Sequence, residues 1–213
     1  MKYLYIDTSS NYLYSGLLIK DQLVGEIKKE LNQNLSKDTL PLIAEMLEKA
    51  NIKPNEIDKI IVVDGPGSFT GIRIGITIAK VYAYCLGIDI TTISSLEAMA
   101  VSAKGEVIVP IIDARREYVY AAIYSDKQKV LLKPQHIKID ELLNKLNQFD
   151  NYSIITNNEF ECFDTTTEYK PDIKNIILTF KDRQNINPHN VNPKYLKLTE
   201  AEENFSSHDK VFE

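Results

Sequence analysis

The chain has 213 residues, and its 30 acidic side chains outnumber the 25 basic ones, which gives a formal net charge of -5. With 44% hydrophobic residues it can bury a sizeable core, so it is neither a disordered tail nor a mini-protein. The acidic balance excludes a protein that holds nucleic acid through its own charge, and two cysteines in unrelated contexts exclude a disulfide framework and a zinc cluster.

The first half of the chain predicts strands and helices in the order βββαβαβα. Residues 40–50 have apolar side chains at intervals of three and four, which is typical of an amphipathic helix, and Pro41 is tolerated only in its first turn. Ser68 is the expected N-cap of a helix that Gly87 ends. The expected strands are residues 2–7, 12–20, 22–31, 59–64 and 90–93, and the expected helices are 40–50, 68–86 and 94–103.

The second half begins with the same order of elements, which indicates an internal duplication, although a common α/β rhythm gives a similar pattern. After residue 156 the sequence turns polar and proline-containing, and no further element is predicted. We expect an α/β protein with two lobes, 1–103 and a reduced 104–213 whose last segment can return to the first lobe. The expected strands are residues 106–112, 118–124, 129–134 and 152–156, and the expected helix is 140–146.

Three aspartates, Asp7, Asp64 and Asp113, each stand at the carboxyl end of a predicted strand, where open α/β sheets place ligands. One interpretation is a Mg²⁺ or phosphate site, since hard cations prefer oxygen ligands from separate strands. The other is that each carboxylate only caps the turn that follows it. The candidate nucleotide-proximal or phosphate-proximal residues are Asp7, Thr8, Ser9, Asp113 and Arg115.

Residues 65–75, GPGSFTGIRIG, lead from a strand into a helix and resemble a phosphate loop at first sight. The lysine that follows the last glycine of a P-loop is absent. Small residues four apart instead form one smooth helical face, which favours close helix packing, either against residues 40–50 of the same chain or across an intermolecular interface. The residues that share this face are Gly71, Gly75, Ala79 and Ala83.

Four segments carry a family resemblance: MKYLYIDTSS at the start, DGPGSFTGIRIG at 64–75, IIDAR at 111–115 and PKYL at 193–196. In this order they resemble the bacterial TsaB (YeaZ) family. The resemblance implies the two-lobed fold of actin, Hsp70 and sugar kinases, which is related to ribonuclease H. It also implies a non-catalytic subunit that pairs with TsaD and works with TsaE to form N6-threonylcarbamoyladenosine at position 37 of tRNAs reading codons that begin with A.

The same resemblance sets expectations for sites and partners. Catalytic relatives hold a metal with two histidines on the first helix, and residues 35–40 contain none, so no metal, catalytic residue or intrinsic cofactor is expected. ATP or ADP is expected only at the interface of the complex, tRNA contact is indirect, and the isolated chain is expected to be a cytoplasmic homodimer with no membrane contact. The candidate partner-interface residues are Leu40, Ile43, Leu47, Phe69, Gly71, Ile72, Gly75, Ala79 and Tyr82.

Two other functions remain open from sequence. Asp7, Glu45 or Glu48, and Asp64 match the order of carboxylates in a Mg²⁺-dependent nuclease of the ribonuclease H type. A small-molecule kinase would share the fold but needs a complete nucleotide cleft. No stretch is expected to reach the ~18 apolar residues that cross a membrane.

Overall fold

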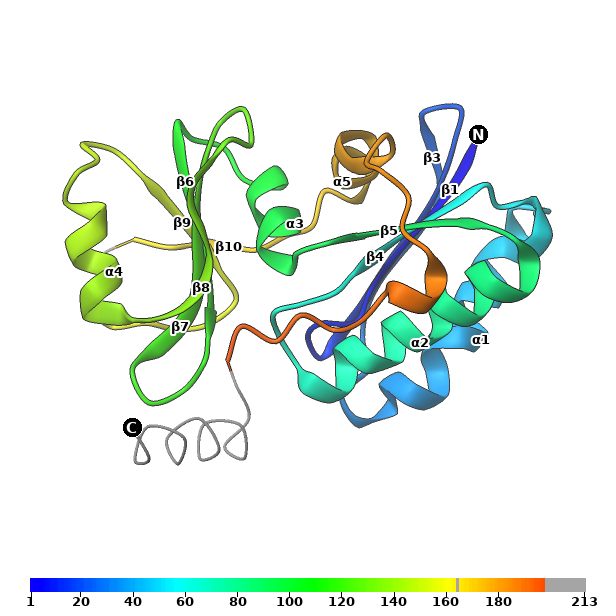
Figure 1. The fold of residues 1–213 in the computed structure, drawn as a ribbon, viewed down its shortest axis with the longest axis horizontal. Helices are drawn as coiled ribbons and strands as arrows, with labels where there is room; N and C mark the ends of the chain where they lie inside the picture. The colour runs from blue at the N-terminus through cyan, green and yellow to red at the C-terminus, as the bar shows by residue number, and fades with distance from the viewer. Residues whose placement is uncertain (164, 198–213) are drawn as a thin grey trace, which may run out of the picture.

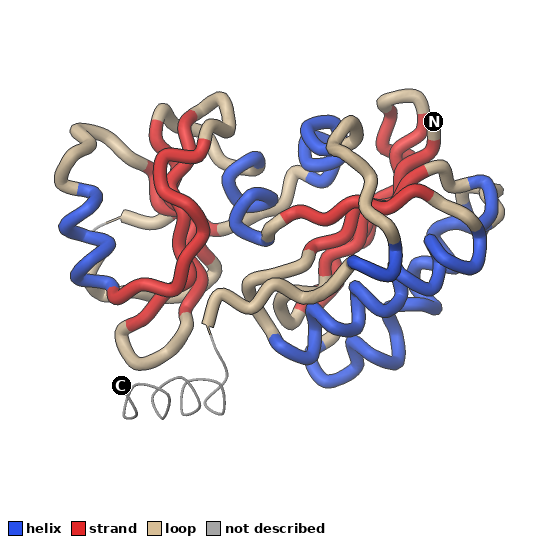
Figure 2. Tube along the Cα trace, viewed as in Figure 1, coloured by secondary structure: helices blue, strands red, loops and turns tan. Residues whose placement is uncertain are grey.

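The computed structural model describes residues 1–163 and 165–197, and these form two lobes with matching sheets (Figures 1 and 2). Each sheet has five strands, in the orders β3-β2-β1-β4-β5 and β8-β7-β6-β9-β10. In both, three antiparallel strands are followed by two parallel ones. The repeated order confirms the internal duplication and the two-lobed α/β fold.

The described elements follow the predicted order closely. The strands are β1 (Lys2–Asp7), β2 (Tyr12–Ile19), β3 (Gln22–Glu30), β4 (Lys59–Val63), β5 (Asp89–Ile93), β6 (Val107–Asp113), β7 (Tyr118–Ser125), β8 (Val130–Lys138), β9 (Ser153–Thr156) and β10 (Thr167–Glu168). The α-helices are α1 (Leu35–Lys49), α2 (Phe69–Leu86), α3 (Ser95–Val101), α4 (Ile139–Leu146) and α5 (Ile173–Phe180).

Helix α2 has the predicted ends. The Ser68 hydroxyl accepts a hydrogen bond from the Gly71 amide at 3.2 Å, and Gly87 closes the helix with φ of 66°, a conformation that glycine adopts without strain. The helix has 18 residues and a mean hydropathy of 1.2, so the expectation that no stretch reaches membrane-spanning length is wrong. In the structure α2 packs beside α1 on one face of the first sheet, with one side buried and the other exposed (Figure 1).

Helix α1 begins five residues earlier than predicted, at Leu35. Leu35 and Thr39 are buried and extend its apolar face toward the N-terminus. Pro41 therefore lies inside the helix rather than in its first turn. The prediction failed because apolar spacing was counted only from Leu40, and Thr39 does not look like a core residue.

Two helices each pack on the sheet of the lobe that they do not follow in the chain. Helix α3 follows the first sheet in the chain but packs on β6, whereas α5 follows the second sheet but packs on β2 of the first. Their side chains join one continuous core that contains Tyr5 and Ile61 of the first lobe and Tyr124 and Ile155 of the second. Elements β10 and α5 were not predicted: β10 has only two residues, and the eight apolar-rich residues of α5 stand between polar, proline-containing segments.

The outer face of the second sheet is covered by less helix than that of the first. Of the helices in residues 1–163 and 165–197, only α4, eight residues long, covers its outer face, where the first lobe has α1 and α2 (Figure 1). Residues 181–197 then run back along the first lobe. The Ile186 amide donates to the Ile90 carbonyl and the Lys194 amide to the Asp64 carbonyl, both at 2.8 Å.

Candidate functional site

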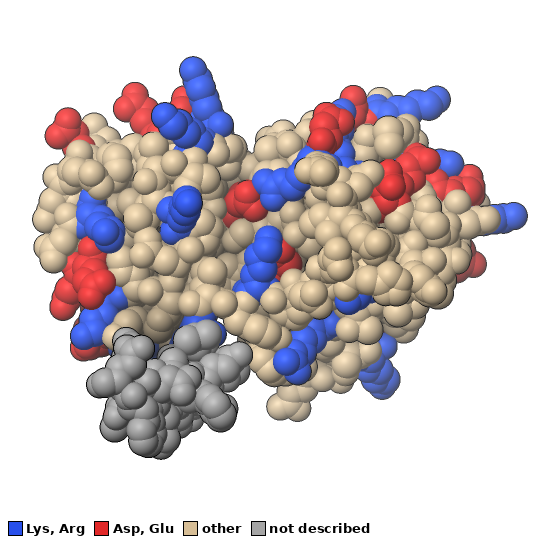
Figure 3. Space-filling view, viewed as in Figure 1, with Lys and Arg blue, Asp and Glu red and all other residues tan. Residues whose placement is uncertain are grey.

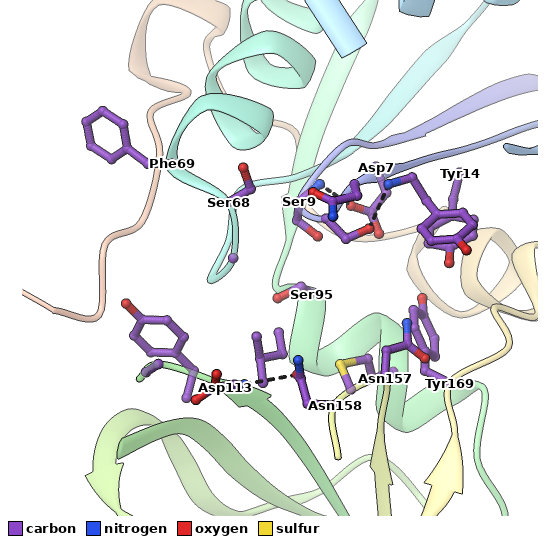
Figure 4. A pocket seen from close by; sticks show the side chains of 18 of the residues that line it. Asp7, Ser9, Tyr14, Ser68, Phe69, Ser95, Asp113, Asn157, Asn158 and Tyr169 are labelled. Atoms are coloured by element: carbon purple, nitrogen blue, oxygen red, sulfur yellow. Dashed lines mark hydrogen bonds between the residues drawn. The ribbon is translucent and has the colours of Figure 1, made fainter. Parts of the chain in front are cut away.

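A cleft of about 760 Å³ lies between the two lobes (Figure 4). Asp7 at the end of β1 and Asp113 at the end of β6 lie on opposite walls, at corresponding points of the two repeats. Ser9 and Arg115 also line the cleft. Thr8 does not, because its side chain is buried and its hydroxyl donates to the Gly71 carbonyl at 2.7 Å.

Both cleft aspartates cap the turns that follow them. The Ser9 amide donates to Asp7 Oδ1 and the Arg115 amide to Asp113 Oδ1, each at 2.8 Å and each from two residues along the chain. Asp7 Oδ2 also accepts from the Tyr5 hydroxyl at 3.2 Å. Burial raises the pKa of Asp7, and the hydrogen bonds from Ser9 and Tyr5 oppose that rise. Both carboxylates therefore cap their turns, as one of the two interpretations predicted.

Asp64 does not join them, so the three predicted carboxylates do not converge. It is only 1% exposed and forms an ion pair with Lys194, 2.7 Å from Nζ to Oδ2. The expected metal or phosphate role is therefore wrong for Asp64. Its carboxylate instead holds the returning segment of the chain against β4.

This ion pair makes a testable prediction. Burial raises the pKa of the Asp64 carboxyl, while Lys194 and the Thr92 hydroxyl lower it. In Lys194→Met that pKa rises further, so the free energy of unfolding should fall by about 1–2 kcal/mol at pH 7, a modest figure because Lys194 is largely exposed. The loss should shrink toward about pH 4, where the carboxyl becomes protonated.

Urea unfolding at both pH values measures the effect. Lys174→Met, which removes an exposed lysine on α5, is the matched control and should change little. An equal loss at pH 4 and pH 7 would contradict the assigned role of the ion pair.

The glycine-rich loop before α2 is held by the protein itself. The Ser68 amide donates to the Ser9 carbonyl at 2.7 Å, and a Cβ at Gly67 would collide with that carbonyl. On the other side, the Ser95 amide and hydroxyl donate to the carbonyls of Gly65 and Pro66, at 3.0 and 2.5 Å. The loop therefore joins β1, α2 and α3, and the amide of Ser68 is not available to a phosphate.

The carboxylates of a ribonuclease H-type nuclease are not assembled. Glu45 lies on α1 and pairs with Lys49 at 2.6 Å, and both Glu45 and Glu48 are exposed. In residues 1–163 and 165–197 no group of three or more acidic, histidine or cysteine side chains could hold a metal ion. The nuclease hypothesis is therefore not supported by the geometry.

The small-residue face of α2 is filled from within the chain. Gly71 and Gly75 lie against Thr8, at the end of β1, and Ala79 is fully buried. At Gly71 and Gly75 the structure shows neither predicted use of this face, packing against α1 or an intermolecular groove, because Thr8 at the end of β1 lies there. Ala79 and Ala83 share a core cluster with α1, as the first of those predictions expected. The predicted interface residues that are buried inside the first lobe are Ile43, Leu47, Gly71, Ile72, Gly75 and Ala79.

Other apolar residues of the first lobe are exposed. Leu40 of α1 is 42% exposed, Phe69 of α2 48%, and Tyr82 is half-buried. Val81 and Tyr84, which sequence reasoning missed, are 53% and 65% exposed on α2. They were overlooked because the search followed small residues, whereas outward-facing residues of an apolar helix are the better signal.

Comparison with known proteins decides the family. A family model described as "TsaD: tRNA N6-adenosine threonylcarbamoyltransferase" matches residues 19–203. The tRNA threonylcarbamoyladenosine biosynthesis protein TsaB of Bacillus subtilis is 31% identical over 95% of this chain and 96% of its own. The chain belongs to the TsaB family. TsaB of Haemophilus influenzae is 35% identical over 54% of this chain and 50% of its own.

Solved structures agree on the fold. YeaZ from Pseudomonas aeruginosa superposes with a TM-score of 0.71 at 17% identity, over 92% of this chain and 99% of that one. A Pseudomonas aeruginosa protein described as similar to peptidase YeaZ gives 0.77 at 18% identity, with the same coverage.

Two of the segments that carry the TsaB resemblance contact each other. The rings of Phe69 and Tyr195 stack with centroids 5.0 Å apart. The Arg73 guanidinium lies 3.8 Å above the Phe69 ring, and its Nε donates to the Tyr195 hydroxyl at 2.7 Å. Together with the Lys194–Asp64 pair, these contacts join segment 193–196 to segment 64–75, although more than 110 residues separate them in sequence.

Proposed function

We propose that this chain acts in tRNA threonylcarbamoyladenosine biosynthesis as a non-catalytic subunit. Its similarity to the Bacillus subtilis TsaB protein along nearly the whole chain carries the proposal. The site chemistry supports the non-catalytic part, because Asp7 and Asp113 cap their own turns and Asp64 is paired with Lys194. The modification would be N6-threonylcarbamoyladenosine at position 37 of tRNAs that read codons beginning with A.

The proposed partner is a TsaD protein, with TsaE in the larger complex. Exposed apolar side chains on α1 and α2 support a docking face, which we define as Leu40, Val81 and Tyr84. Helices α1 and α2 pack beside each other, and a partner that covers both would remove these exposed side chains from solvent. In the absence of the partner, the same face would join two copies of this chain.

Indirect contact with tRNA agrees with the charge of the surface. On the face that Figure 3 shows, acidic and basic side chains are interspersed over both lobes. The net charge of -5 also opposes binding to a phosphate backbone. TsaD would therefore hold the tRNA in the cytoplasm, and any ATP or ADP would bind at the interface of the complex rather than to this chain alone.

Depletion of the chain from its own cell, followed by mass spectrometry of tRNA nucleosides, tests the proposal. Threonylcarbamoyladenosine should fall several-fold and return when the chain is restored. The double variant Asp7→Asn, Asp113→Asn should restore it equally well, since neither carboxylate would act in chemistry. An unchanged level after depletion would refute the pathway, and failure of a folded double variant would refute the non-catalytic role.

A further inference from the structure

Two segments that lie on the first lobe contain no acidic side chain. Neither residues 65–88 nor residues 183–197 include an aspartate or a glutamate, although the chain has 30 of them. The first segment contains α2, and the second is the part of the chain that returns along the first lobe. Their basic residues are Arg73, Lys80, Arg183, Lys194 and Lys197. These two segments therefore carry positive charge in a protein whose net charge is negative.

The two segments lie side by side (Figure 1). Lys80 Nζ donates to the His189 carbonyl at 3.3 Å, and the Tyr84 ring meets the His189 ring edge-on with centroids 4.9 Å apart. Near the other end of α2, Arg73 Nε donates to the Tyr195 hydroxyl. The segments thus form one surface, which we call the basic strip and define as Phe69, Arg73 and Lys80 of α2 with His189 and Tyr195 of the returning segment.

The cations of α2 have no carboxylate beside them. In the part of the chain that the structure describes, no acidic side chain forms an ion pair with Arg73 or Lys80, whereas Arg183 and Lys194 are each paired. Arg73 is exposed, and within the same residues its side chain donates only its Nε–H group, to Tyr195. The terminal N–H groups of its guanidinium are therefore available, and such a fork fits the two oxygens of a carboxylate.

The basic strip continues into the docking face. Lys80 lies one helical turn before Tyr84, and Arg73 lies two turns before Lys80, so the three side chains share one side of α2. Tyr84 belongs to the docking face and is 65% exposed, and Phe69 at the far end of the basic strip is 48% exposed. A partner that covers the docking face would therefore meet the cations of the basic strip at the rim of the interface.

Carboxylates suit the basic strip better than a nucleic acid does. A nucleic acid would need free ring faces for its bases and several cations for its phosphates. The Phe69 ring has Tyr195 stacked on it at 5.0 Å and the Arg73 guanidinium 3.8 Å above it, so its faces are in use. Exposed aromatic and arginine side chains that hold one another in place are instead typical of protein interfaces.

We propose that the basic strip is the charged rim of the docking face, and that the surface of the partner protein opposite it carries carboxylates. One carboxylate binds the terminal N–H groups of Arg73, and another lies near Lys80. Because these charges attract each other before the apolar side chains touch, they speed association more than they slow dissociation. The inference rests on the proposed function, in which the partner is a TsaD protein.

Surface plasmon resonance with the TsaD protein of the same cell measures both rates. Lys80→Glu in the full chain should lower the association rate constant about tenfold at about 50 mM salt and about twofold or less at about 500 mM salt, where the charges are screened. Its dissociation rate constant should change about twofold or less. Arg73→Gln, which removes a charge rather than reversing one, should act in the same direction with a smaller effect.

Lys174→Glu is the matched control. It reverses an exposed charge on α5, which covers the other face of the first sheet, and it should associate as the parent does. The melting temperatures of all three variants identify any that fails to fold. Equal association rates at low salt for the parent and for both folded strip variants, Lys80→Glu and Arg73→Gln, would overturn the proposal.

Two further outcomes separate this inference from its alternatives. A parent chain that binds an RNA oligonucleotide more tightly than it binds TsaD, with that binding lost in Lys80→Glu, would assign the basic strip to nucleic acid and overturn the proposal. A parent chain that does not bind TsaD would refute the proposed partner and the inference together. If the parent binds TsaD and the strip variants associate equally fast, the inference alone fails and the proposed function stands.

Discussion

Replacing Gly75 with leucine is expected to destabilise the first lobe strongly. A Cβ at this position would lie 2.5 Å from Thr8 Oγ1, and Thr8 is itself buried and bonded to the Gly71 carbonyl. The added side chain therefore meets a buried residue that its own hydrogen bond holds in place. Overpacking of this severity should lower the free energy of unfolding by about 3 kcal/mol or more, a large share of what a domain of this size has.

Urea unfolding followed by circular dichroism measures this loss. Thr77→Leu is the matched control, because Thr77 is exposed two residues further along the same helix, and its unfolding midpoint should move little. A Gly75→Leu protein that unfolds at the parental urea concentration would show that the small-residue face is not tightly filled by β1. In that case the small-residue face would again be a candidate surface for binding a partner.

The sequence pattern predicted those features that local chemistry fixes. The meanders, the two-lobe duplication and both ends of α2 follow from alternating apolar residues, from a capping serine and from a glycine at the helix end. The aspartates at the ends of β1 and β6 were also predicted to line a site, because corresponding strands of a duplicated fold end at corresponding places.

Long-range packing could not be predicted in the same way. The face of Gly71 and Gly75 is smooth whether a helix or a strand fills it, and only the position of β1 decides between them. The exchange of α3 and α5 between lobes leaves no local pattern, since either sheet offers an apolar face. The sequence around Asp64 is typical of a ligand-site residue, and its ion pair with Lys194, 130 positions away, could not be predicted from it.

The docking face makes the second strong prediction. Val81→Arg should reduce copurification of the chain with its TsaD partner at least about tenfold, because a charged side chain in the centre of an apolar interface loses its water without gaining a partner. Val81 is 53% exposed, so the isolated protein should remain as stable as the parent, within about 0.5 kcal/mol.

The matched control is Val130→Arg. Val130 is 45% exposed on β8 of the second lobe, so the variant adds the same charge at a similar exposure but away from α1 and α2. It should bind TsaD as the parent does. Sedimentation of the two purified variants separates the homodimer in the same way, since only Val81→Arg should sediment as a monomer. If Val130→Arg loses the partner and Val81→Arg keeps it, the interaction surface lies on the second lobe, and the apolar side chains of α1 and α2 need another explanation.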